Sequence, residues 1–178
     1  KLMEQKKRHE KHGNTEYNLE PNIKEAPGGL RDIQMISWVA RRHFGVESLE
    51  ELIGDDFITP EEYLQLKRDE AFLWKVRYCL HFIAKRPEER LLFDYQRKIA
   101  EIFGYKDGEK RLGVEQFMQH YYQVVLSIRE LNDVLFHHLE EINFPKNKSG
   151  KRLTLNERFV VKNRHIETID EHIFAKEP

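Results

Sequence analysis

Two long stretches in which apolar residues recur at helical spacing limit the fold of this chain more than any other feature. The first begins at Thr59, which can cap a helix, and Pro60, which suits a first helical position, and it runs to about Lys85. The second runs from about Val114 to Asn143. Two helices of this length, each with an apolar stripe, predict a mainly α fold, an antiparallel helical bundle built around two long helices.

Shorter elements are expected around these helices. Residues 1–12 are rich in charge and stop before a glycine, which predicts the last turns of a helix with a glycine C-cap. Another helix is expected after the pair Gly28-Gly29, ending at Gly45. Short strands, which would give a small β piece near each end of the chain, are expected at residues 17–24, 159–161 and 165–169.

Six aromatic side chains on the two long stretches are expected in the core, rather than as a surface on which nucleic-acid bases stack. They are Trp74, Tyr78, Phe82, Phe117, Tyr121 and Tyr122. Cys79 lies among apolar residues, which predicts a buried, unreactive thiol.

Charge and composition exclude several classes of protein. The formal net charge is −1, although 34% of the 178 residues are charged, so binding to nucleic acid is not expected. A single cysteine excludes an intramolecular disulfide framework and a zinc site made of several cysteines. No apolar run reaches the ~18–20 residues that cross a membrane, and no signal peptide is visible, so a soluble cytoplasmic protein is expected. The chain begins at a lysine rather than a methionine, which suggests a piece of a longer protein.

The stretch from Lys24 to Asp32 carries the residues best suited to chemistry. The pair Gly28-Gly29 stands directly before a helix, where unpaired backbone N–H groups would form a cradle for an anion. Lys24 and Arg31 would add positive charge for phosphates, and Asp32 would hold a divalent cation between those phosphates. The alternative is structural: the glycine pair is only a turn, and the charge of Asp32 favours the start of the helix.

At these residues the chain resembles a known family. The run from Tyr17 to Gly45 contains Asn-Leu-Glu-Pro, Ile-Lys, Pro-Gly-Gly-Leu-Arg-Asp-Ile and Trp-Val-Ala-Arg-Arg-His-Phe-Gly, and it resembles the bifunctional uridylyltransferase/uridylyl-removing enzymes. The resemblance continues through residues 73–80, 90–94 and 121–132. Glutamine synthetase adenylyltransferase is more distantly similar, with a glutamate in place of Asp32.

The resemblance implies an activity for the parent enzyme. Members of the family transfer UMP from UTP to a tyrosine of the P-II regulatory protein, with Mg²⁺, when glutamine is scarce. They remove the UMP by hydrolysis when glutamine is plentiful. Transfer belongs to a nucleotidyltransferase domain marked by Gly-Ser and Asp-x-Asp, and neither pattern occurs in this sequence. The chain by itself is therefore not expected to catalyse either reaction.

The resemblance also implies three parts. Residues 1–28 would be the tail of a preceding nucleotidyltransferase domain, and residues 29–145 a helical bundle domain. Residues 146–178 would be a basic loop and an extension toward a following domain.

For the site, the resemblance implies that Asp32 is a third carboxylate ligand of Mg²⁺, or that it holds the ligands in place without contacting the ion. Lys24 and Arg31 would face the triphosphate, while Gly28 and Gly29 would approach the nucleotide. The alternative is a helical interaction or relay module without catalytic residues, which binds P-II or couples domains. The first interpretation predicts that the charged residues converge on an open cleft, and the second predicts that Asp32 is buried against the bundle.

Overall fold

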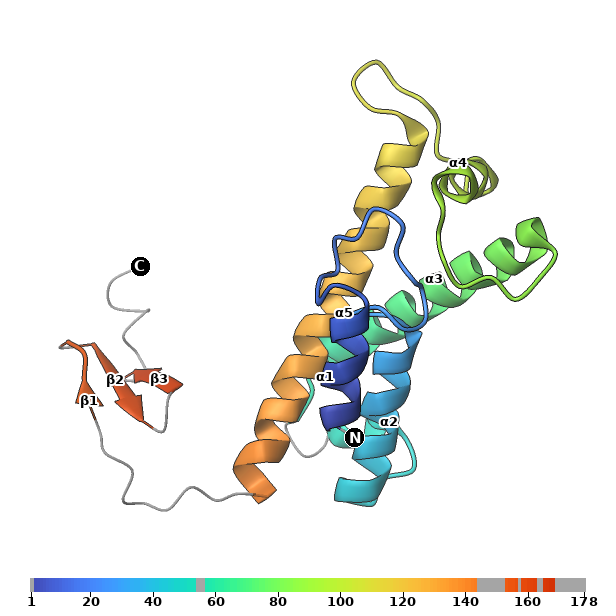
Figure 1. Ribbon diagram of the computed structural model, residues 1–178. Coiled ribbons are helices and arrows are strands. Elements are labelled where there is room, and N and C mark those ends of the chain that lie inside the picture. The colour runs from blue at the N-terminus through green and yellow to red at the C-terminus, as the bar shows by residue number, and fades with distance from the viewer. Residues whose placement is uncertain (1, 54–56, 144–152, 157, 163–164, 169–178) are drawn as a thin grey trace. The chain divides into compact units, whose positions relative to one another are not determined.

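A computed structural model describes residues 2–53, 57–143, 153–156, 158–162 and 165–168 (Figure 1). The chain forms two compact units, Lys1–Phe136 and His137–Pro178. Its helices are α1 (Leu2–Lys11), α2 (Leu30–Phe44), the 3₁₀ helix η1 (Leu49–Ile53), α3 (Pro60–Ala84), α4 (Phe93–Ile102) and α5 (Gly113–Asn143). Its strands are β1 (Leu153–Thr154), β2 (Phe159–Lys162) and β3 (His165–Thr168).

The predicted mainly α class is confirmed by these helices. The finer prediction, an antiparallel bundle with two long helices, stays a prediction, as does the division of the chain into three parts. Helices α3 and α5 meet where Phe72 lies against Phe117 and His120, with ring centroids 6.3 Å and 4.3 Å apart. In Figure 1 the two helices cross at this region rather than running alongside each other.

Local signals in the sequence set the ends of the helices. At the start of α3, the Thr59 hydroxyl accepts from the Glu62 N–H at 3.2 Å, and the Thr59 N–H donates to the Glu62 carboxylate at 2.8 Å. This is the predicted capping box. At the end of α2, Gly45 has a φ of +71°, the left-handed conformation that favours glycine. The predicted boundaries of both helices are therefore confirmed.

The small β piece differs between the two ends. Near the carboxyl end, β1, β2 and β3 form an antiparallel sheet in that order, with Phe159 opposite Thr168. The two strands expected there are confirmed as β2 and β3. The strand expected over residues 17–24 is wrong, because that segment has only an isolated bridge between Asn22 and Arg90. The basic loop expected after α5 lies outside the described residues.

The segment between α1 and α2 is held by side chains and backbone from distant parts of the chain. The Ile23 N–H donates to the Glu89 carbonyl, and the Leu91 N–H donates to the Pro21 carbonyl, each at 2.8 Å. The Gln96 side-chain amide donates to the Leu19 carbonyl at 2.7 Å. Residues 21–23 and 89–91 thus pair over a very short stretch, which is too short to form a regular strand.

Most apolar side chains in the core of the first unit come from α3 and α5. The others come from α2, from α4 and from the segments before these two helices. The fully buried members include Ile23, Leu66, Leu73, Val76, Leu80, Leu91, Ile99, Phe117, Tyr121 and Ile128.

The prediction that six aromatic residues lie in the core is wrong for three of them. Phe117 and Tyr121 are buried and Tyr122 is half-buried. Trp74, Tyr78 and Phe82, in contrast, are 43%, 75% and 74% exposed. Helix α3 carries two apolar stripes, and helical spacing by itself does not tell which stripe faces inward. Cys79 is partly buried, and burial raises the pKa of its thiol, in line with an unreactive cysteine.

No helix among the described residues has the length and apolar character needed to cross a membrane.

The core assignment predicts the effect of shortening a buried side chain in α3. We expect Leu80→Ala to lower the free energy of unfolding by about 2–5 kcal/mol, because it leaves a cavity between α3 and its neighbours. Leu64→Ala is the matched control on the same helix, since Leu64 is 54% exposed. Urea unfolding monitored by circular dichroism measures both, and equal losses would contradict the assignment.

Candidate functional site

The glycine pair before α2 is a point of close backbone packing. Gly28 has a φ of +74°, and a Cβ atom placed on it would lie 2.0 Å from the carbonyl oxygen of Val125 in α5. A Cβ atom on Gly29 would lie 2.7 Å from the carbonyl oxygen of Ile23. Both distances are far shorter than van der Waals contact, so only glycine lets this turn approach α5 and the preceding segment.

The backbone N–H groups at the start of α2 are already bonded within the chain. Gly28 donates to Asp32 Oδ2 at 2.9 Å, and Gly29 donates to the Ala26 carbonyl at 2.9 Å. The next three N–H groups also donate to backbone carbonyls of residues 23–29. The expectation of unpaired N–H groups that cradle an anion is therefore wrong for this conformation. Nucleotide binding by Gly28 and Gly29 stays a prediction.

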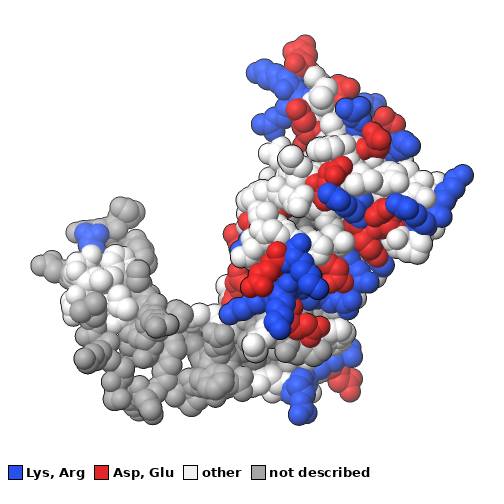
Figure 2. All heavy atoms as spheres, viewed as in Figure 1, with Lys and Arg blue, Asp and Glu red and all other residues white. Residues whose placement is uncertain are grey.

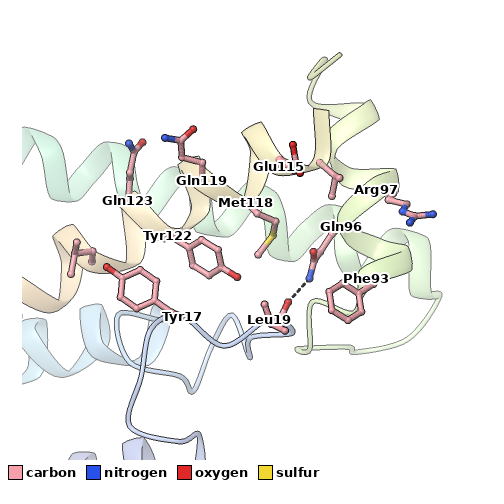
Figure 3. Close-up of a pocket in the computed structure, with 12 residues that line it drawn as sticks. Tyr17, Leu19, Phe93, Gln96, Arg97, Glu115, Met118, Gln119, Tyr122 and Gln123 are labelled. Carbon is pink, nitrogen blue, oxygen red and sulfur yellow. Dashed lines mark hydrogen bonds between the residues drawn. The ribbon is translucent and has the colours of Figure 1, made fainter. Parts of the chain in front are cut away.

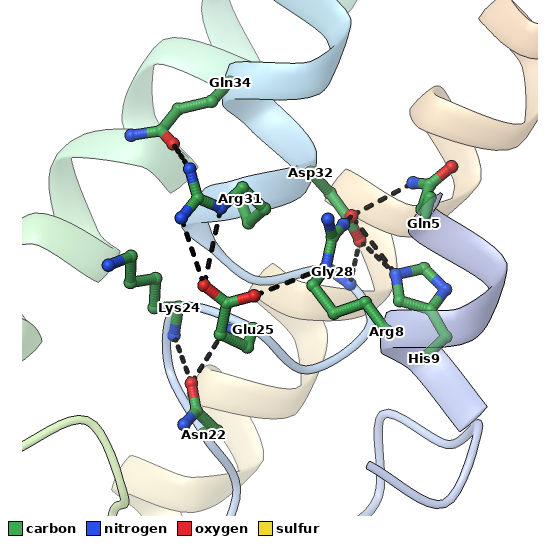
Figure 4. Close-up of polar contacts among 10 residues, drawn as sticks. All are labelled: Gln5, Arg8, His9, Asn22, Lys24, Glu25, Gly28, Arg31, Asp32 and Gln34. Carbon is green, nitrogen blue, oxygen red and sulfur yellow. Dashed lines mark hydrogen bonds and ion pairs between the residues drawn. The ribbon is translucent and has the colours of Figure 1, made fainter. Parts of the chain in front are cut away.

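Asp32 is the centre of a buried polar cluster that joins α1 to α2 (Figure 4). The Gln5 side-chain amide donates to its Oδ1 at 3.0 Å, and the His9 Nε2 atom lies 2.9 Å from its Oδ2. The guanidinium group of Arg8 also donates to Oδ1. With the Gly28 N–H, four different residues surround a carboxylate that has no exposed surface.

These partners determine how Asp32 ionises. Burial alone would raise its pKa, but the hydrogen bond and charge of His9, with smaller contributions from Gln5 and Arg8, bring the pKa below its ordinary value. Asp69 in α3 shows the opposite balance, since burial outweighs its hydrogen bonds and raises its pKa. Asp32 is thus held as a charged group, which pairs with the nearly buried guanidinium group of Arg8.

The two predicted phosphate-binding residues lie differently. The Arg31 guanidinium donates to Glu25 at 3.3 Å and to Gln34 at 3.1 Å, and Glu25 in turn lies 3.8 Å from Arg8. Arg31 therefore belongs to the edge of the cluster. Lys24 points away from Asp32 in Figure 4, and its charge instead lowers the pKa of Glu89. The structure brings together Gly28, Asp32 and, indirectly, Arg31, but not Lys24.

Sequence reasoning missed the partners that α1 supplies. Gln5, Arg8 and His9 lie 23 to 27 residues before Asp32 in the chain, so no local spacing connects them to the motif. The sequence did contain one signal for this contact. Gln5, Arg8 and His9 lie on one face of the predicted helix, and an amide and two basic side chains on one face could bind a buried acid.

The surroundings of Asp32 do not fit a Mg²⁺ ion in this arrangement. Magnesium prefers oxygen ligands and retains several waters, whereas Asp32 faces nitrogen donors from Arg8, His9 and Gln5. Among the described residues, no group of three or more His, Cys, Asp or Glu side chains is placed to hold a metal ion. Magnesium in the parent enzyme stays a prediction.

A second candidate site is a groove of about 680 Å³ between α4, α5 and the segment before α2 (Figure 3). The Tyr17 and Tyr122 rings face it, with their centroids 5.7 Å apart, and Met118 lies beside them. Its lining residues are Tyr17, Leu19, Phe93, Gln96, Arg97, Val114, Glu115, Met118, Gln119, Tyr122, Gln123 and Leu126. A mainly apolar groove with polar groups at its rim suits a side chain or small ligand that is largely apolar.

Sequence reasoning did not predict this groove. Its walls come from three separate parts of the chain, around residues 17–19, 93–97 and 114–126. Tyr122 was assigned to the core from its spacing, although its hydroxyl donates to the Asn18 carbonyl at 3.2 Å at the edge of the groove.

Comparisons with known proteins agree on one family. Residues 1–136 match the family model described as GlnD PII-uridylyltransferase. Relatives named bifunctional uridylyltransferase/uridylyl-removing enzyme are 50% identical in Ectopseudomonas mendocina and Azotobacter vinelandii and 48% identical in Pseudomonas aeruginosa. Each match covers all 178 residues of this chain but 20% of the relative, so the chain spans about one fifth of the length of these proteins. No solved structure matches the chain.

The close approach at Gly28 predicts a difference between two glycines with similar backbone angles. Gly45→Ala is expected to cost about 1 kcal/mol, because its left-handed backbone is strained with a side chain but its surroundings are open. Gly28→Ala is expected to cost a further ~1–3 kcal/mol, because Val125 must move. Urea unfolding of both variants tests this, and similar losses would mean that the turn can shift away from α5 without cost.

The ionisation of Asp32 predicts a dependence of stability on pH. A carboxylate whose folded pKa is lowered stabilises the fold above its unfolded pKa, and this contribution is lost as the pH falls through the folded pKa. Near pH 7, we expect Asp32→Asn to lower the free energy of unfolding by about 3 kcal/mol, because it removes the nearest counter-ion of the nearly buried Arg8 and leaves only the more distant Glu25.

The difference between wild type and Asp32→Asn is expected to shrink below about pH 4, near the unfolded pKa of an aspartate. Unfolding curves for both proteins across this range provide the measurement. A difference that stays constant as the carboxylate titrates would show that charge on Asp32 does not stabilise the fold.

Proposed function

Because the chain belongs to the GlnD PII-uridylyltransferase family, we propose that it is the helical part of a bifunctional uridylyltransferase/uridylyl-removing enzyme. In this proposal the parent enzyme works in the cytoplasm, transfers UMP from UTP to a tyrosine of P-II with Mg²⁺, and removes it by hydrolysis, with glutamine as the effector. The sequence has no Asp-x-Asp pattern, and the relatives are about five times as long. Catalysis therefore belongs to other parts of the parent, and these 178 residues support it.

The observation that carries the proposal is the bonding of Asp32 to α1. The residues that resemble the family most closely hold α1 against the start of α2 through Gln5, Arg8 and His9. We assign α1 and the following segment to the edge of the preceding nucleotidyltransferase domain. Asp32 is then a positioning residue, which sets the place of that domain relative to the helices and so completes the transfer site.

The two basic residues of the motif, Arg31 and Lys24, have different roles in this proposal. Arg31 reaches the triphosphate by exchanging Glu25 for a phosphate group, since its bonds to Glu25 are long, at 3.3 Å and 3.4 Å. Lys24, which points away from the cluster, faces the same nucleotide from the other side of the turn.

A second candidate function is a helical interaction or relay module that binds P-II or couples domains. Burial of Asp32 favours this candidate, because a relay needs α1 and α2 to move together and does not need an exposed acid. The groove beside Tyr17 and Tyr122 offers a surface for a protein partner. In this candidate no residue of the chain touches the reacting groups.

The two candidates are separated by measuring both activities of the full-length parent with Asp32→Asn. We expect UMP transfer to P-II to fall about 100-fold or more, because misplacement of a domain by about 1 Å has effects of this size, while UMP removal is retained. Arg8→Gln is expected to reproduce this pattern, since Arg8 acts through the same contact. Asp69→Asn is the matched control, because Asp69 is also buried but bonds to Gln65 within α3.

Melting temperatures of all four proteins accompany the assays. A loss of transfer with Asp32→Asn but not with Arg8→Gln would make Asp32 a direct participant in the transfer site. The melting temperature of Asp32→Asn is expected to fall with its stability, so both activities are measured well below it. A parallel fall in transfer and removal there would contradict the positioning role and favour the relay module.

A further inference from the structure

The outward face of α3 carries a row of large aromatic side chains. Trp74, Tyr78 and Phe82 follow one another at intervals of four residues, so they line one side of the helix, and they are 43%, 75% and 74% exposed. We call these three residues the α3 aromatic stripe. Leu73 and Leu80 on the opposite side are fully buried, so the core does not need the stripe. A continuous aromatic surface of this kind marks an interaction site.

Both signs of charge lie beside the stripe, but the acidic Glu70, one turn before Trp74, is paired with Lys67 at 2.8 Å. Lys75 and Lys85 are exposed, and neither forms an ion pair with any residue in the part of the chain that the structure describes. Arg77 is different, because it donates to Glu89 at 2.9 Å and 3.1 Å, while its guanidinium carbon lies 5.2 Å from the centre of the Trp74 ring. Figure 2 shows Lys and Arg atoms at the outer end of α3, with Asp and Glu atoms and uncharged surface beside them. A partner therefore needs an apolar face with acidic residues beside it.

The area of the stripe argues against a second copy of the chain as its partner. Aromatic side chains bury about 150–250 Å² each, and these three are already partly covered. Their remaining surface falls well below the ~800 Å² per partner of a stable interface between separate proteins. A segment of the same polypeptide can bind to a smaller surface, since its effective concentration reaches about the millimolar range.

The length of the relatives supplies such a segment. The chain corresponds to 20% of each relative, so about 80% of each relative's polypeptide lies outside the matched region. We propose that the α3 aromatic stripe is the docking surface for an amphipathic helix with acidic flanks, which comes from that remainder of the full-length protein. Aromatic residues spaced by four along α3 match the apolar ridge of a second helix packed against it. This inference depends on family membership and not on the role of Asp32.

Site-specific photo-crosslinking in the full-length protein tests the proposal. Tyr78 is replaced by p-benzoylphenylalanine, the dilute protein is irradiated, and the crosslinked peptides are identified by mass spectrometry. We expect a crosslink within one polypeptide, to a peptide outside these 178 residues that contains several Asp or Glu residues. The same replacement at Val134, which is 46% exposed on α5, is the control and is expected to miss that peptide.

Crosslinks to other positions among the 178 residues, crosslinks between two polypeptides, or the absence of crosslinks would each overturn the proposal. The acidic character of the partner is tested by Lys75→Glu with Lys85→Glu in the crosslinking protein. We expect the yield to fall about fivefold or more while the circular dichroism spectrum is unchanged. An unchanged yield would show that the partner is not acidic. Both UMP activities, measured on the same variants, distinguish this result from a failure of the proposed role of Asp32.

Discussion

A single buried carboxylate holds the amino-terminal part of this structure together. Asp32 has no contact with water, and its charge is stabilised by Gln5, Arg8, His9 and the Gly28 N–H. An isolated charge in such a place would be very unfavourable, so the acid and its partners must be buried together or not at all. The position of α1 therefore depends on α2, and anything attached before α1 is oriented by the same contact.

The glycine pair beside this carboxylate allows close backbone packing because neither residue has a side chain. Gly28 lets the turn approach the Val125 carbonyl of α5, and the N–H groups that follow are all bonded inside the chain. A Gly-Gly turn before a helix is also how many proteins bind phosphate, so the same residues suit two physical roles. Here the structure shows a packed joint between the amino-terminal segment and α5, and this is why a positioning role for Asp32 is favoured over direct contact with a metal ion.

Helix α3 shows how one element can serve two surfaces. Leu73, Val76 and Leu80 complete the core, whereas Trp74, Tyr78 and Phe82 remain on the outside. The proposed docking of a further helix on this exposed aromatic face rests on the chain being about one fifth of the length of its relatives. Helix α3 thus contributes one face to the core and leaves an aromatic face exposed in the same unit.

The sequence by itself determined the elements and the family. The ends of α2 and α3 follow from Gly45 and from the Thr59–Glu62 capping box, which act over a few residues and so can be predicted from neighbours. The run from Tyr17 to Gly45 was specific enough to indicate the family. Only the tertiary structure decided what Asp32 contacts, because its partners lie more than twenty residues away. It also decided which stripe of α3 faces inward, since two apolar stripes satisfy helical spacing equally and only packing against α4 and α5 distinguishes them.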